Sequence, residues 1–355
     1  MERLHIAFFG PVNSGKSTLV NAICGQEVSL VSSQPGTTTD PVRKTVELPG
    51  LGPCVLIDTA GLDDDSLLGP ERRRRTLAIL DEADIAVVLG DAPFVIPGEA
   101  SVSHIPVIHY HRGESIESLL ERLVKAAPKR EEEWLTGDLV QYGDTVLLVM
   151  PQDSEAPKGR LILPQVQVLR ELLDRGCIPV CCTPDSLTKA VETVTPQLVI
   201  TDSQVFGLVN RTIPAQWPLT SFSILLAGAK GDIQTYVEGA KAIDSLKPGD
   251  RVLIAEACTH VPDTEDIGRV KIPALLRKKV SLQIDIAAGN DFPEDLSRYS
   301  LIIHCGACVA TRTLVQHRIK KALLAGVPMT NYGIALAKLT GILDRISLQT
   351  RPQSF

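Results

Sequence analysis

Aromatic and basic residues are both scarce in this sequence, and their scarcity disfavours two classes of nucleic-acid-binding protein. Phe, Tyr and Trp make up 4% of the 355 residues, whereas single-strand-binding surfaces need aromatic side chains arrayed along a groove. Lys and Arg number 36 against 42 Asp and Glu, which gives a formal net charge of -6. A protein that binds a nucleic-acid backbone usually carries an excess of basic residues. We therefore expect no nucleic-acid partner.

Long apolar runs are missing as well. No stretch approaches the length of about 18 apolar residues that a membrane span needs, and Met1 to His5 lead directly into a folded pattern rather than a signal peptide. We expect a cytoplasmic protein with no membrane partner. The 8 cysteines are too sparse for a disulfide scaffold, so in a reducing compartment they are core thiols, metal ligands or catalytic groups.

Strand and helix patterns alternate along the whole chain. The first part predicts strands at 5–9, 53–57, 85–89 and 105–109, and helices at 18–24 and 115–127. Proline and charge in residues 127–133 indicate a domain boundary. Alternation resumes from 145 to 210, and a third unit begins with an expected strand at 224–227. This order predicts the α/β class with mainly parallel sheets, arranged as a first domain and two smaller ones, at 1–128, 133–220 and 221–355.

Residues Gly10 to Ser17 read Gly-Pro-Val-Asn-Ser-Gly-Lys-Ser and match the phosphate-binding pattern G-x-x-x-x-G-K-S/T. They lie between an expected strand and an expected helix, as this motif requires. Glycines let backbone N–H groups converge on the phosphates, and the helix N-terminus favours negative charge. Lys16 would reach the outer phosphates and Ser17 would ligate Mg²⁺. The sequence therefore predicts a nucleotide site.

Two further segments extend this prediction. Asp58-Thr59-Ala60-Gly61 follows an expected strand, where its carboxylate could hold Mg²⁺ and its glycine N–H could sense a γ-phosphate, and Thr37 to Thr39 lie in the polar loop before it. These motifs resemble those of translation-factor-type P-loop GTPases, in which the asparagine would bind K⁺ and a threonine would complete the Mg²⁺ shell. The candidate nucleotide-binding residues are Asn13 (K⁺), Ser14, Gly15, Lys16, Ser17 (Mg²⁺), Thr18, Thr38 (Mg²⁺), Asp58 (Mg²⁺) and Gly61.

The motif by which GTPases read guanine, Asn-Lys-x-Asp, does not occur in the chain. Only 21 residues separate Asp91 from Gly113, fewer than the roughly 30 of one βαβ unit, and residues 113–119 resemble the start of the final helix. We expect a deleted base-reading segment, doubtful guanine selectivity, weak phosphate and Mg²⁺ binding, and slow or absent hydrolysis. The run Arg72 to Arg75 is interpreted as a solvated helix face, with a contact to phosphate or another domain as the alternative.

Cysteines and histidines follow two expected strands of the last domain. Cys258-Thr259-His260 comes just after one strand, and His304-Cys305-Gly306-Ala307-Cys308 comes directly after another. Carboxyl ends of parallel strands gather at one edge of a sheet, where ligands bind, so we expect the two segments to meet.

Three thiolates at such a site suit a [4Fe–4S] cluster whose fourth iron is open or held by a weaker ligand, for which His260, Glu265 and His304 are the candidates. A Cys₃His zinc site is the principal rival. A redox dithiol of Cys305 and Cys308 is a third interpretation, and buried free thiols are the fourth.

The whole arrangement resembles the HydF family of [FeFe]-hydrogenase maturation factors over nearly the full length. The resemblance rests on the P-loop domain, Cys258-x-His260 and His304-Cys305-x-x-Cys308, with further similar stretches at 156–167, 249–260, 265–273 and 331–333. It implies a P-loop GTPase-like domain, a middle dimerisation domain and a last domain that holds a [4Fe–4S] cluster on Cys258, Cys305 and Cys308. The fourth ligand of the family is exchangeable, and Glu265 or His304 would be the matching residue.

The resemblance also implies a role as a scaffold and carrier. Such a protein accepts a di-iron precursor with CO and cyanide ligands from two radical-SAM maturases and passes it to apo-[FeFe]-hydrogenase, with GTP binding and hydrolysis to GDP as regulation. A homodimer or higher homo-oligomer is implied. The alternatives are an RNA- or ribosome-associated K⁺-stimulated GTPase, which the acidic charge disfavours, and a zinc or dithiol protein with a vestigial P-loop domain.

Overall fold

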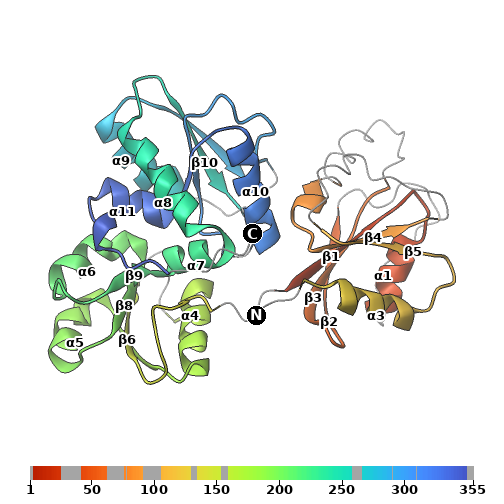
Figure 1. Cartoon of the computed structure of the whole chain (residues 1–355), viewed down its shortest axis with the longest axis horizontal. Coiled ribbons are helices and arrows are strands. Elements are labelled where there is room, and N and C mark those ends of the chain that lie inside the picture. Colours follow the sequence, from red (N-terminus) through yellow and green to blue (C-terminus); the bar gives the residue numbers. More distant parts are fainter. Residues whose placement is uncertain are drawn as a thin grey trace. The chain divides into compact units, whose positions relative to one another are not determined.

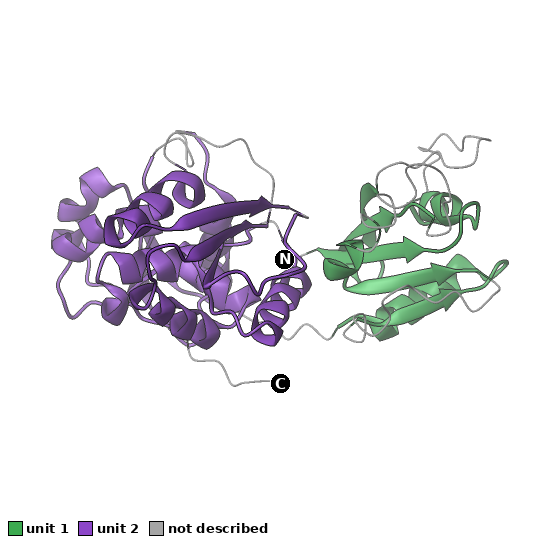
Figure 2. Ribbon diagram, turned by 90° about the horizontal axis from the view of Figure 1, so that it is seen from above, with its two compact units in different colours: residues 1–131 green, residues 132–355 purple. Residues whose placement is uncertain are grey.

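The computed structural model divides the chain into two compact units, residues 1–131 and 132–355 (Figures 1 and 2). It describes residues 3–24, 41–61, 76, 78–90, 105–128, 134–152, 159–257, 266–289, 291–308 and 310–349. The candidates Thr38, Arg72 to Arg75, Cys258, His260 and Glu265 lie outside these ranges. Within them, no helix has both the length and the apolar character that crossing a membrane requires.

Unit 1 contains a five-stranded sheet in the order β2-β3-β1-β4-β5. Only the pairing of β2 with β3 is antiparallel. Helices α1 and α3 pack on one face of this sheet, and the short helix η1 packs on the other. The elements are β1 (Leu4–Phe9), α1 (Lys16–Cys24), β2 (Val42–Leu48), β3 (Gly52–Asp58), η1 (Ile79–Asp81), β4 (Ile85–Leu89), β5 (Val107–Tyr110) and α3 (Ile116–Ala126).

The four strands and two helices predicted for unit 1 are confirmed, and the helix expected at 18–24 begins two residues earlier, at Lys16. Strand β2 was not predicted. Its sequence Val-Arg-Lys-Thr-Val-Glu-Leu is largely polar, and the strand is mostly exposed because it lies at the edge of the sheet. Charged residues are common on edge strands, where they discourage pairing with other chains.

Unit 2 contains two four-stranded parallel sheets of the same topology, β7-β6-β8-β9 and β11-β10-β12-β13. The first is built from β6 (Thr145–Val149), α4 (Leu163–Asp174), β7 (Ile178–Cys182), η3 (Pro184–Ser186), α5 (Leu187–Thr193), β8 (Leu198–Thr201), η4 (Ser203–Val205), α6 (Phe206–Thr212), β9 (Leu219–Ser221) and α7 (Phe222–Lys230). The second is built from α8 (Ile233–Lys241), η5 (Ala242–Asp244), β10 (Arg251–Glu256), η6 (Ile267–Lys271), α9 (Ile272–Lys279), β11 (Gln283–Ala288), β12 (Leu301–His304), α10 (Arg312–Leu324), β13 (Met329–Asn331), α11 (Tyr332–Leu339) and η7 (Leu343–Arg345).

The two sheets of unit 2 correspond to an internal repeat in the sequence. The last strand and helix of each half share the pattern Pro-x-Thr-x-x-x-Ile-x-Leu-Ala, at 218–227 and 328–337. In both copies the final strand residue caps the helix: Ser221 Oγ accepts from the Ile224 N–H at 3.3 Å, and Asn331 Oδ1 accepts from the Ile334 N–H at 2.9 Å. This repeat was not predicted from the sequence.

The strand expected at 224–227 is wrong, because these residues lie within helix α7. The segment Ile-Leu-Leu-Ala is apolar throughout, and α7 is buried where it contacts α4, α8, α10 and α11. A short apolar run is common to buried strands and to buried helices, so periodicity alone does not separate them. Helix α7 is therefore a central element of unit 2.

A single hydrophobic core joins the two halves of unit 2. It extends from Leu147 and Val199 in the first sheet to Ile254 and Ile303 in the second. Because this core is continuous, the two sheets pack as one compact unit.

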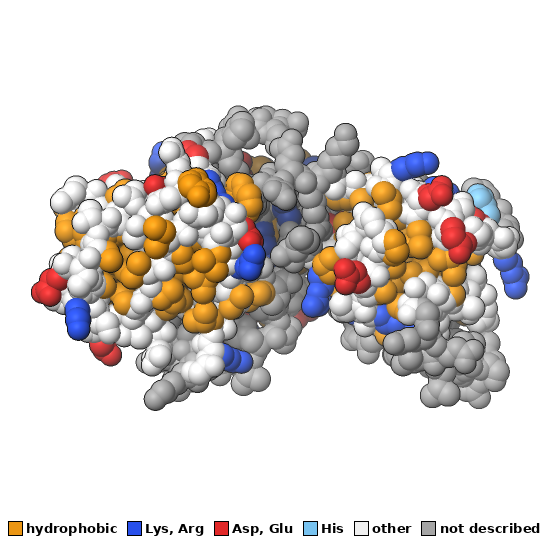
Figure 3. All heavy atoms as spheres, turned by 90° about the horizontal axis from the view of Figure 1, so that it is seen from below, with side chains coloured by type: hydrophobic (Ala, Val, Ile, Leu, Met, Phe, Trp, Pro, Cys, Tyr) orange, Lys and Arg blue, Asp and Glu red, His pale blue; other side chains and the backbone are white. Residues whose placement is uncertain are grey.

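Exposed hydrophobic side chains occur on the first half of unit 2. Helix α4 exposes Leu163, Val166 and Leu173, and the edge strand β7 exposes Ile178 at 56%. Figure 3 shows hydrophobic side chains gathered over one face of this unit. Such patches are typical of surfaces that bind other proteins.

We expect Ile254→Ala to lower the free energy of unfolding of unit 2 by about 3 kcal/mol, because it truncates a fully buried side chain and leaves a cavity in its place. The matched control is Ile286→Ala on edge strand β11, where the side chain is 44% exposed and the loss should stay below about 1 kcal/mol. Urea denaturation followed by circular dichroism measures both. Equal losses for the two variants would contradict the central position of β10.

Candidate functional site

The turn between β1 and α1 forms the phosphate loop. Gly10 has φ +152°, and a Cβ added there would lie 2.5 Å from the Leu89 carbonyl oxygen, so glycine is required beside β4. Lys16 is buried, and its Nζ donates to the carbonyl oxygens of Gly10 and Pro11 at 2.9 and 2.7 Å. The loop therefore folds around its own lysine, at the N-terminus of α1.

The other loop residues place polar groups around this lysine. Asn13 and Gly15 have φ values of 60° and 94°, which lie in the left-handed region. Ser14 Oγ accepts from Lys16 Nζ at 3.4 Å. Asn13 and Thr18 are exposed. The nucleotide and K⁺ contacts expected of these residues stay predictions.

Ser17 and Asp58 lie together, as an Mg²⁺ site requires. The Ser17 hydroxyl donates to Asp58 Oδ2 at 2.6 Å, while Asp58 Oδ1 is buried and has no hydrogen-bond partner in the part of the chain that the structure describes. Burial raises the pKa of Asp58 above its usual value. A buried carboxylate oxygen without a partner, beside a serine hydroxyl, fits a hard divalent cation. Gly61 also packs on the loop, since a Cβ there would lie 2.4 Å from the Val12 side chain.

Strand β5 and helix α3 are joined by a short turn. The Tyr110 hydroxyl donates to the Glu114 carbonyl oxygen at 2.9 Å, and Ser115 Oγ accepts from the Ser118 N–H at 3.2 Å to cap α3. The Glu114 carboxylate accepts from Arg122 at 2.7 Å. These hydrogen bonds hold the start of α3 against the end of β5.

The cysteine site lies at the carboxyl ends of β10 and β12. These strands are parallel neighbours, with Ala255 opposite His304. The Cys305 sulfur accepts from the backbone N–H groups of Ala257 at 3.1 Å and Ala307 at 3.4 Å. Ala257 directly precedes Cys258 in the sequence. Backbone amides aimed at a cysteine sulfur favour the thiolate and tune bound iron–sulfur clusters.

Lys230 holds the loop that contains Cys305 and Cys308. Its side chain is the last of α7 and is 8% exposed. Its Nζ donates to the carbonyl oxygens of Ala307, Cys308 and Ala310 at 2.8, 3.1 and 2.7 Å. Ala307 has φ 51°, an unusual conformation for a residue with a side chain. The loop thus turns its carbonyls toward one ammonium group.

His304 is fully buried, and both of its ring nitrogens have partners. Nδ1 lies 2.8 Å from the Cys305 carbonyl oxygen, and Nε2 lies 3.0 Å from Arg318 Nη1. Because a guanidinium can only donate, Nε2 accepts and Nδ1 donates. Burial lowers the pKa of His304 to about 3, so the ring is neutral. To bind a metal, His304 would first have to release one of these hydrogen bonds.

Arg318 connects the ends of three strands. Besides His304 it donates to the carbonyl oxygens of Glu256 at 3.3 Å and Gly289 at 2.5 Å. Its guanidinium carbon also lies 4.8 Å from the centre of the Phe292 ring. This buried side chain therefore fixes the edge of the sheet on which the cysteines lie.

A buried ion pair joins the end of β10 to helix η6. The Glu256 carboxylate, 1% exposed, accepts from Arg269 Nε and Nη2 at 3.0 and 2.7 Å. Asp266 caps η6 by accepting from the Arg269 N–H at 2.7 Å. Glu256 and Asp266 thus both accept charge-assisted bonds from Arg269, which are stronger than neutral ones.

The Tyr332 hydroxyl is buried and has no hydrogen-bond partner among the described residues. It packs against Gly268, where an added Cβ would lie 2.0 Å from it. Burial raises the pKa of Tyr332, and nearby Cys305 and Glu256 raise it further. A buried donor without an acceptor, close to a cysteine, fits a site that receives a sulfur- or oxygen-bearing group.

The described ranges contain no cluster of three or more His, Cys, Asp or Glu able to hold a metal. Three of the six predicted ligands, Cys258, His260 and Glu265, lie outside those ranges. The ligand set therefore stays a prediction.

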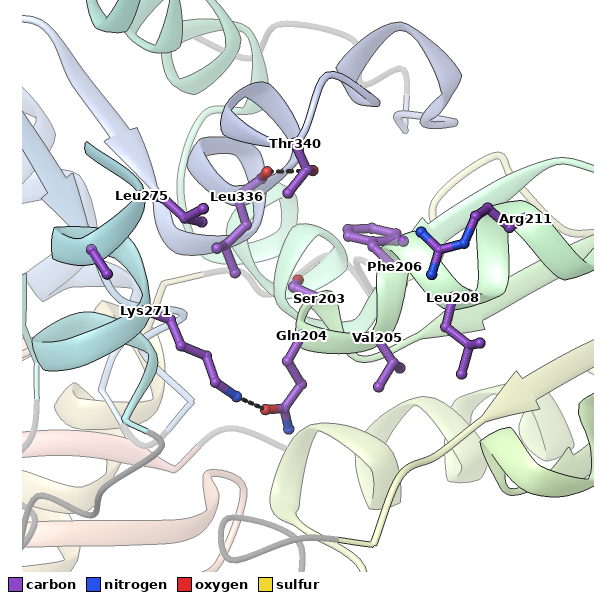
Figure 4. A pocket seen from close by; sticks show the side chains of 12 residues that line it. Ser203, Gln204, Val205, Phe206, Leu208, Arg211, Lys271, Leu275, Leu336 and Thr340 are labelled. Atoms are coloured by element: carbon purple, nitrogen blue, oxygen red, sulfur yellow. Dashed lines mark hydrogen bonds between the residues drawn. The ribbon is translucent and has the colours of Figure 1, made fainter. Parts of the chain in front are cut away.

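A pocket of about 530 Å³ lies between the two halves of unit 2 (Figure 4). It is bounded by η4 and α6 on one side and by η6, α9 and α11 on the other. Lys271 reaches across it and donates to Gln204 Oε1 at 2.8 Å, and Arg211 extends at its rim. The pocket shares helix η6 with the ion pair of Glu256.

Sequence reasoning missed the charged residues that surround the cysteines, Lys230, Arg269 and Arg318. No motif marks Lys230 or Arg318, and Arg269 lies in the family-like stretch 265–273 without a role assigned to it, because each side chain acts on a partner from another element. For Lys230, the Lys at the end of an apolar run was a possible signal, since cations are common in the last turn of a helix, but that run was interpreted as a strand.

Three family models match the chain in sequence. Residues 5–128 match a 50S ribosome-binding GTPase, residues 135–231 match the hydrogen maturase F dimerization domain, and residues 234–349 match the hydrogen maturase F tetramerization domain. Together they cover nearly all of the chain in the order expected from the motifs.

Curated relatives match only part of the chain. The tRNA modification GTPase MnmE of Acidiphilium cryptum is 45% identical over 98 residues, which are 27% of this chain and 22% of that protein. MnmE of Nitrosospira multiformis is 32% identical over 143 residues, 38% of this chain and 31% of that protein. The chain thus spans less than a third of the length of these relatives.

Solved structures are similar at a low level. An Era variant of Aquifex aeolicus bound to GDP and aluminium fluoride shares 17% identity, covers 83% of this chain and 97% of its own, and has a TM-score of 0.27. An NFeoB variant of S. thermophilus bound to GMPPNP shares 20% identity, covers 35% and 60%, and has a TM-score of 0.24. Scores this low carry no argument, so the α/β assignment rests on the sheets and the family models.

We expect Arg269→Met to destabilise unit 2 by about 3 kcal/mol, because it leaves the buried Glu256 carboxylate without its partner. The matched control is Lys279→Met, which removes an exposed ion pair with Asp244 and should cost less than about 1 kcal/mol. Urea denaturation at pH 7 measures both. Similar small losses would contradict a structural role for the Glu256 pair.

Proposed function

Because the chain belongs to the hydrogen maturase F family, we propose that it is a scaffold which carries a di-iron precursor to apo-[FeFe]-hydrogenase on a domain that binds a [4Fe–4S] cluster. Its two hydrogen maturase F domains follow a GTPase domain. The observation that carries the proposal is the sulfur of Cys305, which receives two backbone N–H groups, one of them from the residue before Cys258.

The residues at this edge fit a cluster. Cys258, Cys305 and Cys308 would hold three irons, with Glu265, His260 or His304 as the fourth ligand. A bound cluster would supply an iron with an exchangeable ligand, the attachment point that a cargo of iron, CO and cyanide needs.

The chain's own groups orient this site. Lys230 fixes the carbonyls of the cysteine loop, and the Ala257 and Ala307 amides donate to sulfur. The Tyr332 hydroxyl is a buried donor near Cys305. In this proposal two radical-SAM maturases supply the cargo and apo-hydrogenase receives it. The dimerization and tetramerization domains indicate a homo-oligomer.

Nucleotide binding is regulatory in this proposal. The GTPase domain indicates binding of GTP with Mg²⁺. Ser17, Asp58 and Thr38 would hold the Mg²⁺, Lys16 would exchange its loop carbonyls for phosphate, and Asn13 would bind K⁺. Hydrolysis of GTP to GDP would change the state of the carrier rather than form its product.

We expect Cys305→Ser to abolish cluster binding. After anaerobic reconstitution, wild-type protein should contain about four irons and four sulfides per chain with an EPR signal when reduced, whereas the variant should retain little of either. The control is Cys181→Ser, which replaces an exposed cysteine on β7 and should keep the wild-type iron content. Maturation of apo-hydrogenase should follow the iron content in both variants.

Two outcomes would overturn this proposal. Stoichiometric zinc without iron in the wild type would favour the zinc protein with a vestigial P-loop domain. Full maturation activity in Cys305→Ser would exclude the cysteine site from the carrier role.

We expect the nucleotide site to bind the phosphates without selecting the base. Dissociation constants for Mg-GTP and Mg-ATP should agree within about fivefold, because a site that rejects the wrong base by about 10⁴-fold needs dedicated hydrogen-bonding groups. Inorganic tripolyphosphate should compete with both nucleotides. Isothermal titration calorimetry measures the dissociation constants of all three ligands.

Two variants control this measurement. Lys16→Ala should lose binding of all three ligands, and Lys125→Ala, on the exposed side of α3, should leave it unchanged. Binding of GTP about 100-fold tighter than ATP would contradict the prediction and would indicate a base-reading segment elsewhere in the chain.

A further inference from the structure

We propose that Lys230 is a positioning residue that couples the dimerization domain to the cysteine loop. It lies within the match to the dimerization domain, residues 135–231, whereas the loop that it binds lies within the match to the tetramerization domain, residues 234–349. The iron measurements described below rest on the proposed function, whereas the contact between Lys230 and the loop does not.

The contact is strong because it satisfies a buried charge. An ammonium group has three donors, and burying it without partners is costly. Lys230 places its donors on three carbonyls of a single turn, within 2.7 to 3.1 Å. Removal of the ammonium group would take one donor from each of these carbonyls, while the Ala307 carbonyl would keep a second hydrogen bond, from the Ala310 N–H at 3.1 Å.

The contact also fixes the direction of one amide of the loop, the N–H of Cys308. A trans peptide is planar, so its N–H points opposite to its C=O. Since the Ala307 carbonyl points at Lys230, the N–H of Cys308 points away from it. The Ala307 N–H donates to the Cys305 sulfur. The amide that donates to the sulfur belongs to the peptide directly before the Ala307 carbonyl that Lys230 binds, so Lys230 anchors the next peptide of the same turn.

Lys230 is held in place by the neighbouring helix. Gln316 Nε2, on α10, donates to the Lys230 carbonyl oxygen at 3.0 Å. Helix α10 begins directly after the cysteine loop, where Thr311 Oγ1 caps it by accepting from the Leu314 N–H at 3.2 Å. A shift of α7, such as one imposed by subunit association, would therefore move the carbonyl anchor of the loop.

Lys230→Met tests this coupling. In the metal-free protein, iodoacetamide should alkylate Cys305 and Cys308 at least about fivefold faster than in the wild type, because a loop without its anchor opens more often. In the reconstituted protein, iron loss to a chelator should be about tenfold faster, the usual effect of removing a group that orients metal ligands. The midpoint potential should become more negative, because a nearby positive charge is lost.

The matched control is Lys338→Met. Lys338 lies in the last turn of α11, the repeat of α7, but pairs with Asp244 at the surface. Alkylation, iron loss and potential should match the wild type in this variant. Lys230→Arg, which keeps the charge, should restore much of the midpoint potential even where its larger side chain disturbs the loop.

Rates of alkylation and iron loss within twofold of the wild type in Lys230→Met would overturn the proposal. If that variant fails to fold, Lys230→Gln replaces it and the same limits apply. The alkylation measurement needs no metal, so it decides the role of Lys230 even if the wild-type protein takes zinc. Failure of the carrier function and failure of this coupling are therefore distinguishable.

Discussion

Parallel pairing of β10 with β12 is the constraint on which the cysteine site depends. It brings the residue before Cys258 within hydrogen-bond distance of the Cys305 sulfur. The hydrogen-bond acceptors at these strand ends are largely buried and need donors, which three charged side chains supply. Arg318 donates to the strand ends, Arg269 to the Glu256 carboxylate, and Lys230 to the cysteine loop. Buried charges need an ion pair or hydrogen bonds, so these residues favour one arrangement of the edge.

The two halves of unit 2 show how one topology supports two different edges. Strands β8 and β12 occupy the same place in their sheets, so the residue that directly follows each strand lies at an equivalent position. In the second half that residue is Cys305. In the first half it is Asp202, which accepts from Gln165 at 2.8 Å. The same strand end thus carries a thiol in one copy and a hydrogen-bonded carboxylate in the other, beside helix α4 with its exposed apolar side chains.

Much of this architecture could be predicted because it is local in sequence. The phosphate loop is contiguous from Gly10 to Ser17, and the cysteines directly follow strands with clear apolar patterns. The strand at 224–227 was wrong because a helix buried on all sides has no polar face to reveal its period. That error also hid Lys230, whose partners lie 77 to 80 residues away. Contacts over such distances follow from tertiary packing, which no local pattern encodes.

The hydrogen bonds of Lys16 within its own loop affect the free energy of phosphate binding. Its ammonium group already has the carbonyl oxygens of Gly10 and Pro11 as acceptors. A phosphate must therefore replace these two hydrogen bonds. Its affinity for the site reflects the difference in free energy between Lys16 bound to phosphate and Lys16 bound to the loop carbonyls. The loop therefore has hydrogen-bond acceptors of its own for the lysine when no phosphate is present, and the P-loop conformation does not depend on a ligand to satisfy these donors.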